Sequence, residues 1–264
     1  MIQFFKKIAV SFFLLLLVAA VHAEDMYIVL MAGQSNMAGR GLTRPQDTIT
    51  YSNIYSLNKD SVWVVAKNPV HWDKTAAGVG MGITFAHELS NKIGKKVKIG
   101  LVPCAAGGTS VDEWLSNAWF PFASINLYSN LINRARKAAK SGKIIGMIWH
   151  QGESDANSRK YEAYQKKLET LFLRIRKDLN LPNMPIVAGE LGLFKPADGP
   201  SFKDSINASI HRLKATLPYY DVAKSESLTP NSDNIHFTSE SQTIFGGRYA
   251  ELFYPLAFGK KKAK

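Results

Sequence analysis

Apolar residues in this chain gather in continuous runs that alternate with longer stretches of mixed character. Five of the runs have the length of a strand, at 26–32, 97–103, 144–150, 185–191 and 222–224. Each run is continuously apolar rather than alternating, which is typical of strands in a parallel sheet that is covered on both faces. We therefore predict a central, mainly parallel sheet of five strands.

The stretches between these runs carry apolar residues at helical spacing. Helices are predicted at 84–93, 125–139, 161–179, 205–216 and 239–252, and the third has the clearest apolar stripe, with Arg and Lys opposite. Alternation of strands and helices predicts a three-layer α/β/α sandwich with right-handed crossovers. Such folds bind ligands at the carboxyl ends of their strands.

Between the first two runs, residues 41–82 have poor periodicity, and we expect them to form a long excursion over one sheet edge. The segment 78–82 of this region is rich in glycine. It lacks the lysine of a Walker phosphate loop and does not follow a clear strand. A turn leading into the next helix is therefore predicted, and no nucleotide cofactor.

The first 23 residues have the composition of an export signal. Lys6 and Lys7 precede the apolar stretch 8–21, and Val21-His22-Ala23 has the small-x-small pattern of a cleavage site. The stretch is shorter than the roughly 20 residues that span a bilayer. We predict cleavage after Ala23, a secreted or periplasmic product without a membrane segment, and one domain over 24–264. A retained anchor is the alternative.

Charge and cysteine content narrow the classes of function. The formal net charge is +12, but two lysines lie in the export segment and four lie within 260–264. No arginine-rich groove or zinc-finger spacing accompanies this charge, so no nucleic-acid partner is predicted. Cys104 is the only cysteine, which excludes an internal disulfide, and its apolar surroundings predict a buried, inert thiol.

Three polar segments stand out from this pattern, and two of them directly follow predicted strands. They are Gly33-Gln34-Ser35-Asn36-Met37, His150-Gln151-Gly152-Glu153-Ser154-Asp155 and, near the C-terminus, Asp233-Asn234-Ile235-His236. A serine hydroxyl is a weak nucleophile until a base, usually histidine, takes its proton, and a carboxylate orients that histidine. The three segments together predict a serine hydrolase with Ser35 as its nucleophile.

His236 is the predicted base. It lies in a polar loop, three residues after Asp233, so that the carboxylate can meet Nδ1 while Nε2 faces the serine. The other histidines of 24–264 lie in predicted helices, beside a tryptophan or in the second polar segment: His71, His87, His150 and His211. The spacing to His236 favours Asp233 as the carboxylate. Glu153 is a second candidate, and a role for both is a third possibility that the sequence leaves open.

An oxyanion hole is predicted from three donors: the Ser35 N–H, a backbone N–H of the Gly107-Gly108 pair, and the side-chain amide of Gln151. Trp114 follows shortly and is interpreted as a packing residue rather than a wall of the pocket. Metal binding by the second polar segment, through His150, Glu153 and Asp155, is a rival interpretation. A helical His-x-x-x-His pair is missing from it, so no metal is predicted.

Four strings in this chain resemble those of the SGNH (GDSL-like) hydrolase superfamily. They are GQSNMAG (33–39), GGTSVDEW (107–114), WHQGESDA (149–156) and DNIHFT (233–238). More narrowly, they are similar to carbohydrate esterase family 6 and the sialate O-acetylesterase-type domain. The resemblance implies Ser35 as nucleophile, His236 as base, and the Ser35 N–H, the Gly107 N–H (in preference to Gly108) and the Gln151 amide as oxyanion donors.

The same resemblance implies metal-independent removal of O-acetyl groups from an acetylated poly- or oligosaccharide, through an acetyl-enzyme. The short chain is more similar to acetylxylan esterases than to the longer sialate esterases. Two further interpretations remain open at this point. One is a short-chain lipase or thioesterase with the same machinery, and the other is a catalytically silent glycan-binding protein on the same fold.

Overall fold

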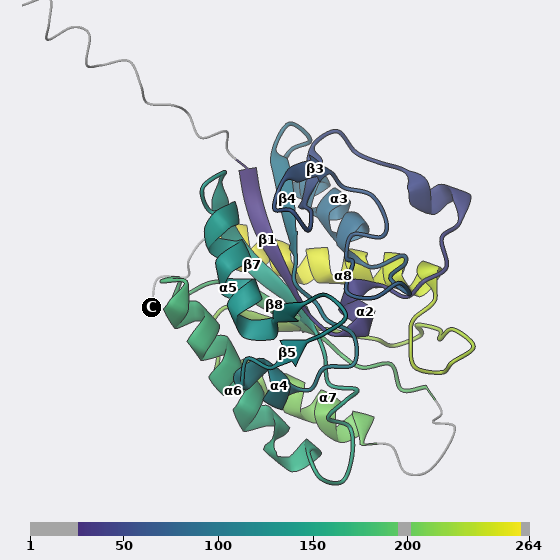
Figure 1. Ribbon diagram of the computed structural model, residues 1–264, viewed down its shortest axis with the longest axis vertical. Coiled ribbons are helices and arrows are strands. Elements are labelled where there is room, and N and C mark those ends of the chain that lie inside the picture. The colour runs from purple at the N-terminus through teal and green to yellow at the C-terminus, as the bar shows by residue number, and fades with distance from the viewer. Residues whose placement is uncertain (1–25, 195–201, 260–264) are drawn as a thin grey trace, which may run out of the picture.

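A sheet of seven strands forms the middle layer of the protein, and helices cover both of its faces (Figure 1). The computed structural model describes residues 26–194 and 202–259, so the predicted export segment and the lysines of 260–264 lie outside the described residues. The strand order is β3-β2-β4-β1-β7-β8-β9. The strands are β1 (Met26–Gly33), β2 (Ile54–Leu57), β3 (Trp63–Val65), β4 (Lys98–Pro103), β7 (Lys143–His150), β8 (Ile186–Gly189) and β9 (Tyr220–Ala223).

The five predicted strands are all present, as β1, β4, β7, β8 and β9, and they pair in parallel. The α/β/α sandwich is therefore confirmed, but the sheet is larger than predicted. The region 41–82 adds β2, which pairs in parallel with β4, and β3, which is antiparallel at the edge. These two strands have only 4 and 3 residues. They are too short for a periodic pattern to reveal them.

The central strand β1 shows why the strand sequences are continuously apolar. Ile28 and Leu30 point into a core on one face of the sheet, whereas Val29 and Met31 point into a core on the other face. All four side chains have no exposed surface. Burial of each such side chain contributes about 1.5–3 kcal/mol to folding. These successive side chains of β1 point to opposite faces of the sheet, yet all of them are apolar. Both faces must therefore be covered by other parts of the protein.

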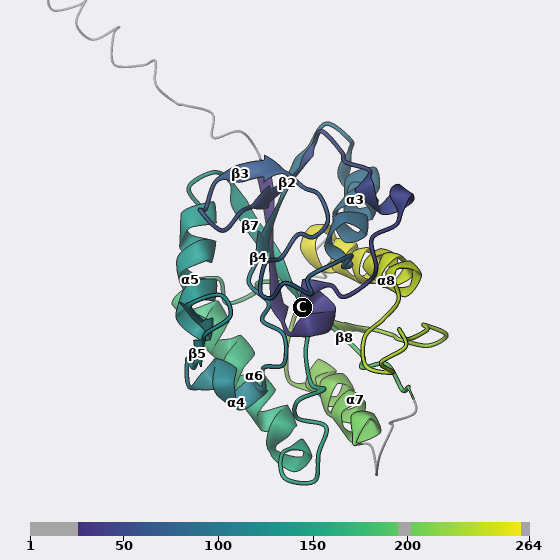
Figure 2. The same ribbon diagram turned by 45° about the vertical axis from the view of Figure 1, so that its right-hand side comes forward.

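Helices provide this cover in two groups, which lie on opposite sides of the sheet in Figure 2. The first group is α4 (Val111–Leu115), α5 (Leu127–Ala138), α6 (Tyr161–Asp178) and α7 (Lys203–Arg212), and the second is α3 (Gly82–Ile93) and α8 (Ser239–Phe258). The remaining short elements are the helix α2 (Ser35–Ala38), the 3-10 helices η1 (Pro45–Thr48) and η2 (Leu213–Ala215), and a hairpin of β5 (Trp119–Phe120) and β6 (Ile125–Asn126). No helix within the described ranges combines the length and the apolar composition of a bilayer span.

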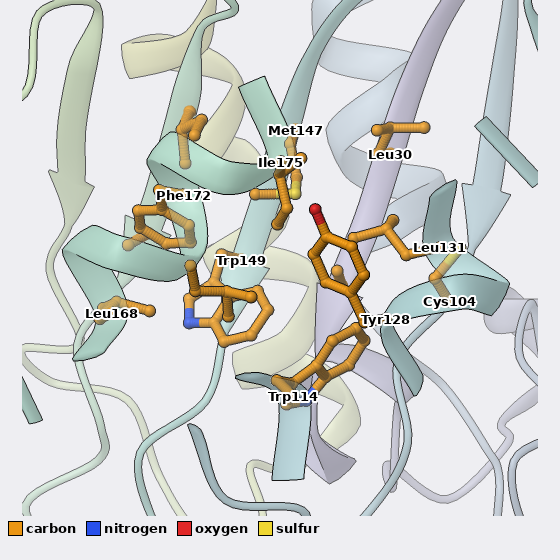
Figure 3. Packing of buried hydrophobic residues seen from close by; sticks show 14 of the residues in the cluster. Leu30, Cys104, Trp114, Tyr128, Leu131, Met147, Trp149, Leu168, Phe172 and Ile175 are labelled. Atoms are coloured by element: carbon orange, nitrogen blue, oxygen red, sulfur yellow. The ribbon is translucent and has the colours of Figure 1, made fainter. Parts of the chain in front are cut away.

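The core under the first helix group contains two residues for which the sequence made a prediction (Figure 3). Trp114 is fully buried and packs edge-to-face on Trp149, with ring centroids 5.3 Å apart, so its interpretation as a packing residue is confirmed. Cys104 is 2 % exposed, and burial raises the pKa of its thiol to about 11. The thiol is therefore protonated and inert at neutral pH, as predicted.

Strand order determines where the polar segments meet. The central strand β1 lies between β4 and β7, and the chain leaves β1 to form strands on either side of it. This is the switch point at which open α/β sheets place their ligands. The loops that follow β1, β4 and β7 begin with Gln34, Cys104 and Gln151, and they bring Ser35, the Gly107-Gly108 pair and Glu153 to one edge of the sheet.

Candidate active site

A tight turn at the end of β1 sets the position of Ser35. Gly33 has a φ of 129°, and a Cβ atom at this position would lie 2.1 Å from the His150 carbonyl oxygen of β7. The next residue, Gln34, donates its N–H to the same oxygen at 2.8 Å. Only glycine allows the two strands to approach so closely. Ser35 then begins α2, where the first backbone N–H groups have no acceptor within the helix.

Ser35 and His236, which are 201 residues apart, meet at this edge. Ser35 Oγ lies 2.9 Å from His236 Nε2, and His236 Nδ1 lies 2.6 Å from Asp233 Oδ2. Ser35 is 6 % exposed, and the side chain of His236 is 21 % exposed, so the pair is sheltered but reachable. The carboxylate fixes the proton on Nδ1 and leaves Nε2 as an acceptor for the serine proton.

The loop that carries Asp233 holds its carboxylate in the ionised form. The second oxygen, Oδ1, accepts the N–H groups of Ile235 and His236, each at 2.9 Å. Burial alone would raise the pKa of this carboxyl, but the hydrogen bonds from His236 and Ile235 lower it below its ordinary value. Asp233 therefore stays charged wherever a neutral His236 can act as a base.

Glu153, the other candidate carboxylate, contacts different partners. Its Oε1 accepts a hydrogen bond of 2.6 Å from Asn36 Nδ2 and lies 3.4 Å from His150 Nε2. Burial acts to raise the pKa of Glu153, but the hydrogen bonds from His150 and Asn36 outweigh it and lower the pKa. Of the two carboxylates, Asp233 is thus the one that the structure places against the imidazole of His236.

Asn36, for which no role was predicted, links Glu153 to the histidine loop. Its amide donates to the Ile235 carbonyl at 3.2 Å, and its Oδ1 accepts the Phe237 N–H at 3.1 Å. Asn36 is 1 % exposed. It therefore holds the backbone on both sides of His236, and Glu153 orients it. The one feature of the sequence that could have pointed to Asn36 is its position directly after Ser35.

The remaining histidines make other contacts. His71 is 3 % exposed, and burial lowers its pKa to about 4, so the ring is neutral at neutral pH. The partners of His87, His150 and His211 include Tyr51, Tyr249 and Glu190, respectively. Among the described histidines, only His236 contacts Ser35 by a hydrogen bond.

Two of the three predicted oxyanion donors have acceptors within the protein, beginning with Gly107. Its N–H donates to Asp73 Oδ2 at 2.7 Å and is therefore occupied. The pair still lies against the nucleophile, because a Cβ atom on Gly107 would be 3.3 Å from Ser35 Cβ. Gly108, the alternative that the sequence left open, is exposed and has a φ of +86°.

Gln151 also lies differently from the prediction. The side chain is fully buried, and its amide nitrogen donates to Thr109 O at 3.0 Å and to Asp155 Oδ2 at 2.5 Å. Both N–H bonds thus have acceptors inside the protein, and neither is free for a substrate oxygen. Gln151 instead ties the loop after β4 to the loop after β7. Asp155 supports the same contact, since its Oδ2 also accepts the Val111 N–H at 2.9 Å.

A buried ion pair beneath the glycine loop was not predicted either. Arg40 Nη2 lies 2.6 Å from Asp73 Oδ2, and the two side chains are 7 % and 2 % exposed. The same carboxylate holds the Gly107 N–H, and Arg40 also donates to the Gly39 carbonyl. The pair therefore connects the segment after Ser35 to the loop after β4. Neither residue lies in a polar cluster of the sequence, so only the fold reveals the contact.

Asp73→Asn is expected to lower the free energy of unfolding by about 3–5 kcal/mol, because it leaves the Arg40 guanidinium buried without its counter-ion. Urea denaturation measures the change. Asp112→Asn is the matched control, since Asp112 pairs with Lys167 at 2.7 Å but is 46 % exposed. That control is expected to cost at most about 1 kcal/mol. Equal losses in the two variants would contradict a structural role for the Arg40–Asp73 pair.

Metal binding by the second polar segment was the rival interpretation, and the described part of the chain shows no set of ligands arranged for it. Within residues 26–194 and 202–259, no group of three His, Cys, Asp or Glu side chains is placed to hold a metal ion. His150 faces Glu153 and Tyr249, whereas Asp155 faces Gln151 and the Val111 N–H. These side chains serve contacts within the protein.

Comparison with known proteins places this chain in a family. Residues 25–255 match the family described as "Carbohydrate esterase, sialic acid-specific acetylesterase". A probable carbohydrate esterase of Arabidopsis thaliana is 32 % identical over 246 residues, which cover 86 % of this chain and 89 % of that protein.

Solved structures agree with this comparison. An Arabidopsis thaliana protein structure superposes with a TM-score of 0.76 at 31 % identity, covering 87 % of this chain and 98 % of that one. A carbohydrate acetylesterase of Xanthomonas citri shares the fold, with a TM-score of 0.66 at 20 % identity, covering 89 % of this chain and 57 % of that one. The family match spans most of the chain, and the resemblance seen in the sequence is confirmed. The chain therefore belongs to the sialic acid-specific acetylesterase family of carbohydrate esterases, on an SGNH-type hydrolase fold.

Proposed function

We propose that this carbohydrate esterase is an exported O-acetylesterase that works through a serine nucleophile and an acetyl-enzyme. The observation that carries the proposal is the hydrogen-bonded series from Ser35 Oγ through His236 to Asp233. It lies at the sheet edge where this fold binds ligands. A silent glycan-binding protein would have no need of this series.

In the first half of the proposed reaction, Ser35 Oγ attacks the acetyl carbonyl carbon while His236 Nε2 takes the serine proton. The sugar oxygen leaves as the carbon–oxygen bond breaks, and His236 returns the proton to it. In the second half, His236 takes a proton from water, and the hydroxide attacks the acetyl-enzyme. Acetate then leaves and the proton returns to Ser35.

The negative charge that develops on the carbonyl oxygen needs donors. We propose the N–H of Ser35, at the start of α2, and the N–H of Gly108, in the exposed loop beside it. Loss of one such donor typically raises the barrier by about 3–4 kcal/mol. The proposed roles of Gln151 and Asp73 are to hold this loop in place through Thr109 and Gly107.

Two substrates are proposed for the site. Acetylated xylan is the first, because the resemblance seen in the sequence includes acetylxylan esterases. An O-acetylated sialic acid is the alternative, which is supported by the description of the matched family. Export rests on the sequence of residues 1–23. A lipase or thioesterase with the same machinery remains the competing activity.

Acyl-chain preference separates these activities. Among p-nitrophenyl esters, the highest kcat/KM is expected for the acetyl ester, because the substrate acyl group is acetate. An optimum at eight or more carbons would contradict deacetylation.

Addition of a chelator is expected to leave the rate unchanged, because His236 and Asp233 supply the base. Loss of activity that zinc restores would contradict this mechanism. Acetate release from acetylated xylan, acetylated sialic acid and acetylated peptidoglycan then ranks the glycans.

A further inference from the structure

The β5–β6 hairpin presents aromatic rings to solvent close to the candidate active site. Phe122, in the turn of the hairpin, is 68 % exposed, and Trp119 on β5 is 58 % exposed, whereas Phe120 between them is 6 % exposed. Phe120 contacts Phe122 with ring centroids 5.4 Å apart and so anchors the turn in the core. Aromatic residues such as Phe and Trp are enriched at binding interfaces relative to the rest of a protein surface.

A lysine completes this surface. Lys74 Nζ lies 4.4 Å from the ring centroid of Phe122 and 5.7 Å from that of Phe120. Within the part of the chain that the structure describes, no carboxylate lies within ion-pair distance of this ammonium group. The nearest acid in sequence, Asp73, is paired with Arg40. Lys74 therefore presents a positive charge beside an exposed aromatic ring.

This surface adjoins the nucleophile through the two glycines. A Cβ atom on Gly108 would lie 3.7 Å from Lys74 Nζ, and one on Gly107 would lie 3.3 Å from Ser35 Cβ. Ser35 and Lys74 thus lie against two neighbouring residues of the same loop. Phe122 lies beside Lys74, so both side chains are close to the loop that contacts the nucleophile.

We propose that Phe122 and Lys74 form a saccharide subsite that favours a sugar bearing a carboxylate. The apolar face of the pyranose packs on Phe122, and the carboxylate of that sugar, or of the acetylated sugar itself, pairs with Lys74. The subsite deepens the proposed function, on which it rests. Two kinds of sugar carry this chemistry: uronic acids, such as the glucuronic acid branches of acetylated xylan, and sialic acids.

Two pairs of substrates test the preference for charge. The first is an acetylated xylo-oligosaccharide with and without a glucuronosyl branch, and the second is an O-acetylated N-acetylneuraminic acid and its carboxamide. For at least one pair, kcat/KM for acetate release should be about fivefold higher for the charged member. A fivefold ratio corresponds to the free energy that an exposed ion pair typically contributes. The pair that shows the effect identifies the source of the carboxylate. No preference in either pair would overturn the proposal.

Two variants assign that preference to residues. Lys74→Met is expected to raise KM for the charged member alone, by about fivefold, and to leave kcat unchanged. Phe122→Ala is expected to raise KM for both members of the pair. Lys92→Met is the matched control, because Lys92 also lies near an aromatic ring, at 5.9 Å from Tyr254, but on helix α3 and paired with Glu251. Leu173→Ala, at an exposed position of α6, is the control for Phe122.

A charge preference that persists unchanged in Lys74→Met would overturn the subsite. Failure of the proposed function gives a different result, since wild-type protein would then release no more acetate from p-nitrophenyl acetate than Ser35→Ala does. Melting temperatures exclude unfolding as the cause of a change in KM. The charge preference should also weaken at high salt, because exposed charges are screened.

Discussion

Ser35→Ala is expected to lower kcat for acetate release by about 10⁴- to 10⁶-fold, the range seen when a serine nucleophile is removed. Without Oγ, no acetyl-enzyme can form, and His236 has no hydroxyl to activate. Release of p-nitrophenol from the acetyl ester measures the change. The melting temperature should stay close to that of the wild type, because the substitution removes a single oxygen atom at the sheet edge.

Ser116→Ala is the matched control for this variant. Ser116 follows α4, and its hydroxyl donates to the Glu113 carbonyl at 3.3 Å in an exposed position. Its loss should leave kcat unchanged. If Ser35→Ala kept more than a tenth of the wild-type rate, another group would have to be the nucleophile.

Asp233→Asn is expected to lower kcat by about 10⁴-fold, because the amide no longer fixes the tautomer and charge of the imidazole. Glu153→Gln is expected to lower it by only about 10- to 100-fold, through a small displacement of the Asn36–His236 contacts. The same ester assay measures both variants, and a parallel urea denaturation separates loss of fold from loss of chemistry.

The sequence favoured Asp233 but kept Glu153 as a candidate, and the two variants distinguish between them. Asp233 Oδ2 lies 2.6 Å from His236 Nδ1, whereas Glu153 acts on the histidine loop through Asn36. An effect of Glu153→Gln equal to or larger than that of Asp233→Asn would assign the triad carboxylate to Glu153. Equal KM values in wild type and Asp233→Asn would support a role in chemistry rather than in binding.

Burial explains how much of the fold was predictable. Helices cover both faces of the strands β1, β4, β7, β8 and β9. Successive residues of these strands are therefore buried, and each strand is a continuous apolar run in the sequence. The edge strands β2 and β3 are short, and β3 includes the exposed residues Val64 and Val65. Their pairing depends on neighbours in space, and so no local pattern predicted them.

The same distinction applies to the site. Ser35, Asp233 and His236 could be proposed because each is a polar residue in a short segment with a chemical reason for its type. The contacts around these residues could not be predicted from the sequence, because they join residues that are 33 to 42 positions apart. These contacts are Arg40–Asp73, Asp73–Gly107 and Gln151–Thr109. These contacts decide which N–H groups remain for an oxyanion. A motif shows which residue types are present. It does not show which of their N–H groups already donate to acceptors inside the protein.

Covalent labelling with an alkyl fluorophosphonate tests the role of Ser35 directly. The serine oxygen bonds to phosphorus, fluoride leaves, and His236 takes the serine proton, as in the proposed acetyl transfer. Mass spectrometry of the digested protein is expected to find one adduct, on Ser35, with esterase activity lost in step with labelling and no adduct in Ser35→Ala. An adduct on a different residue, or full activity after Ser35 is labelled, would contradict catalysis by this serine.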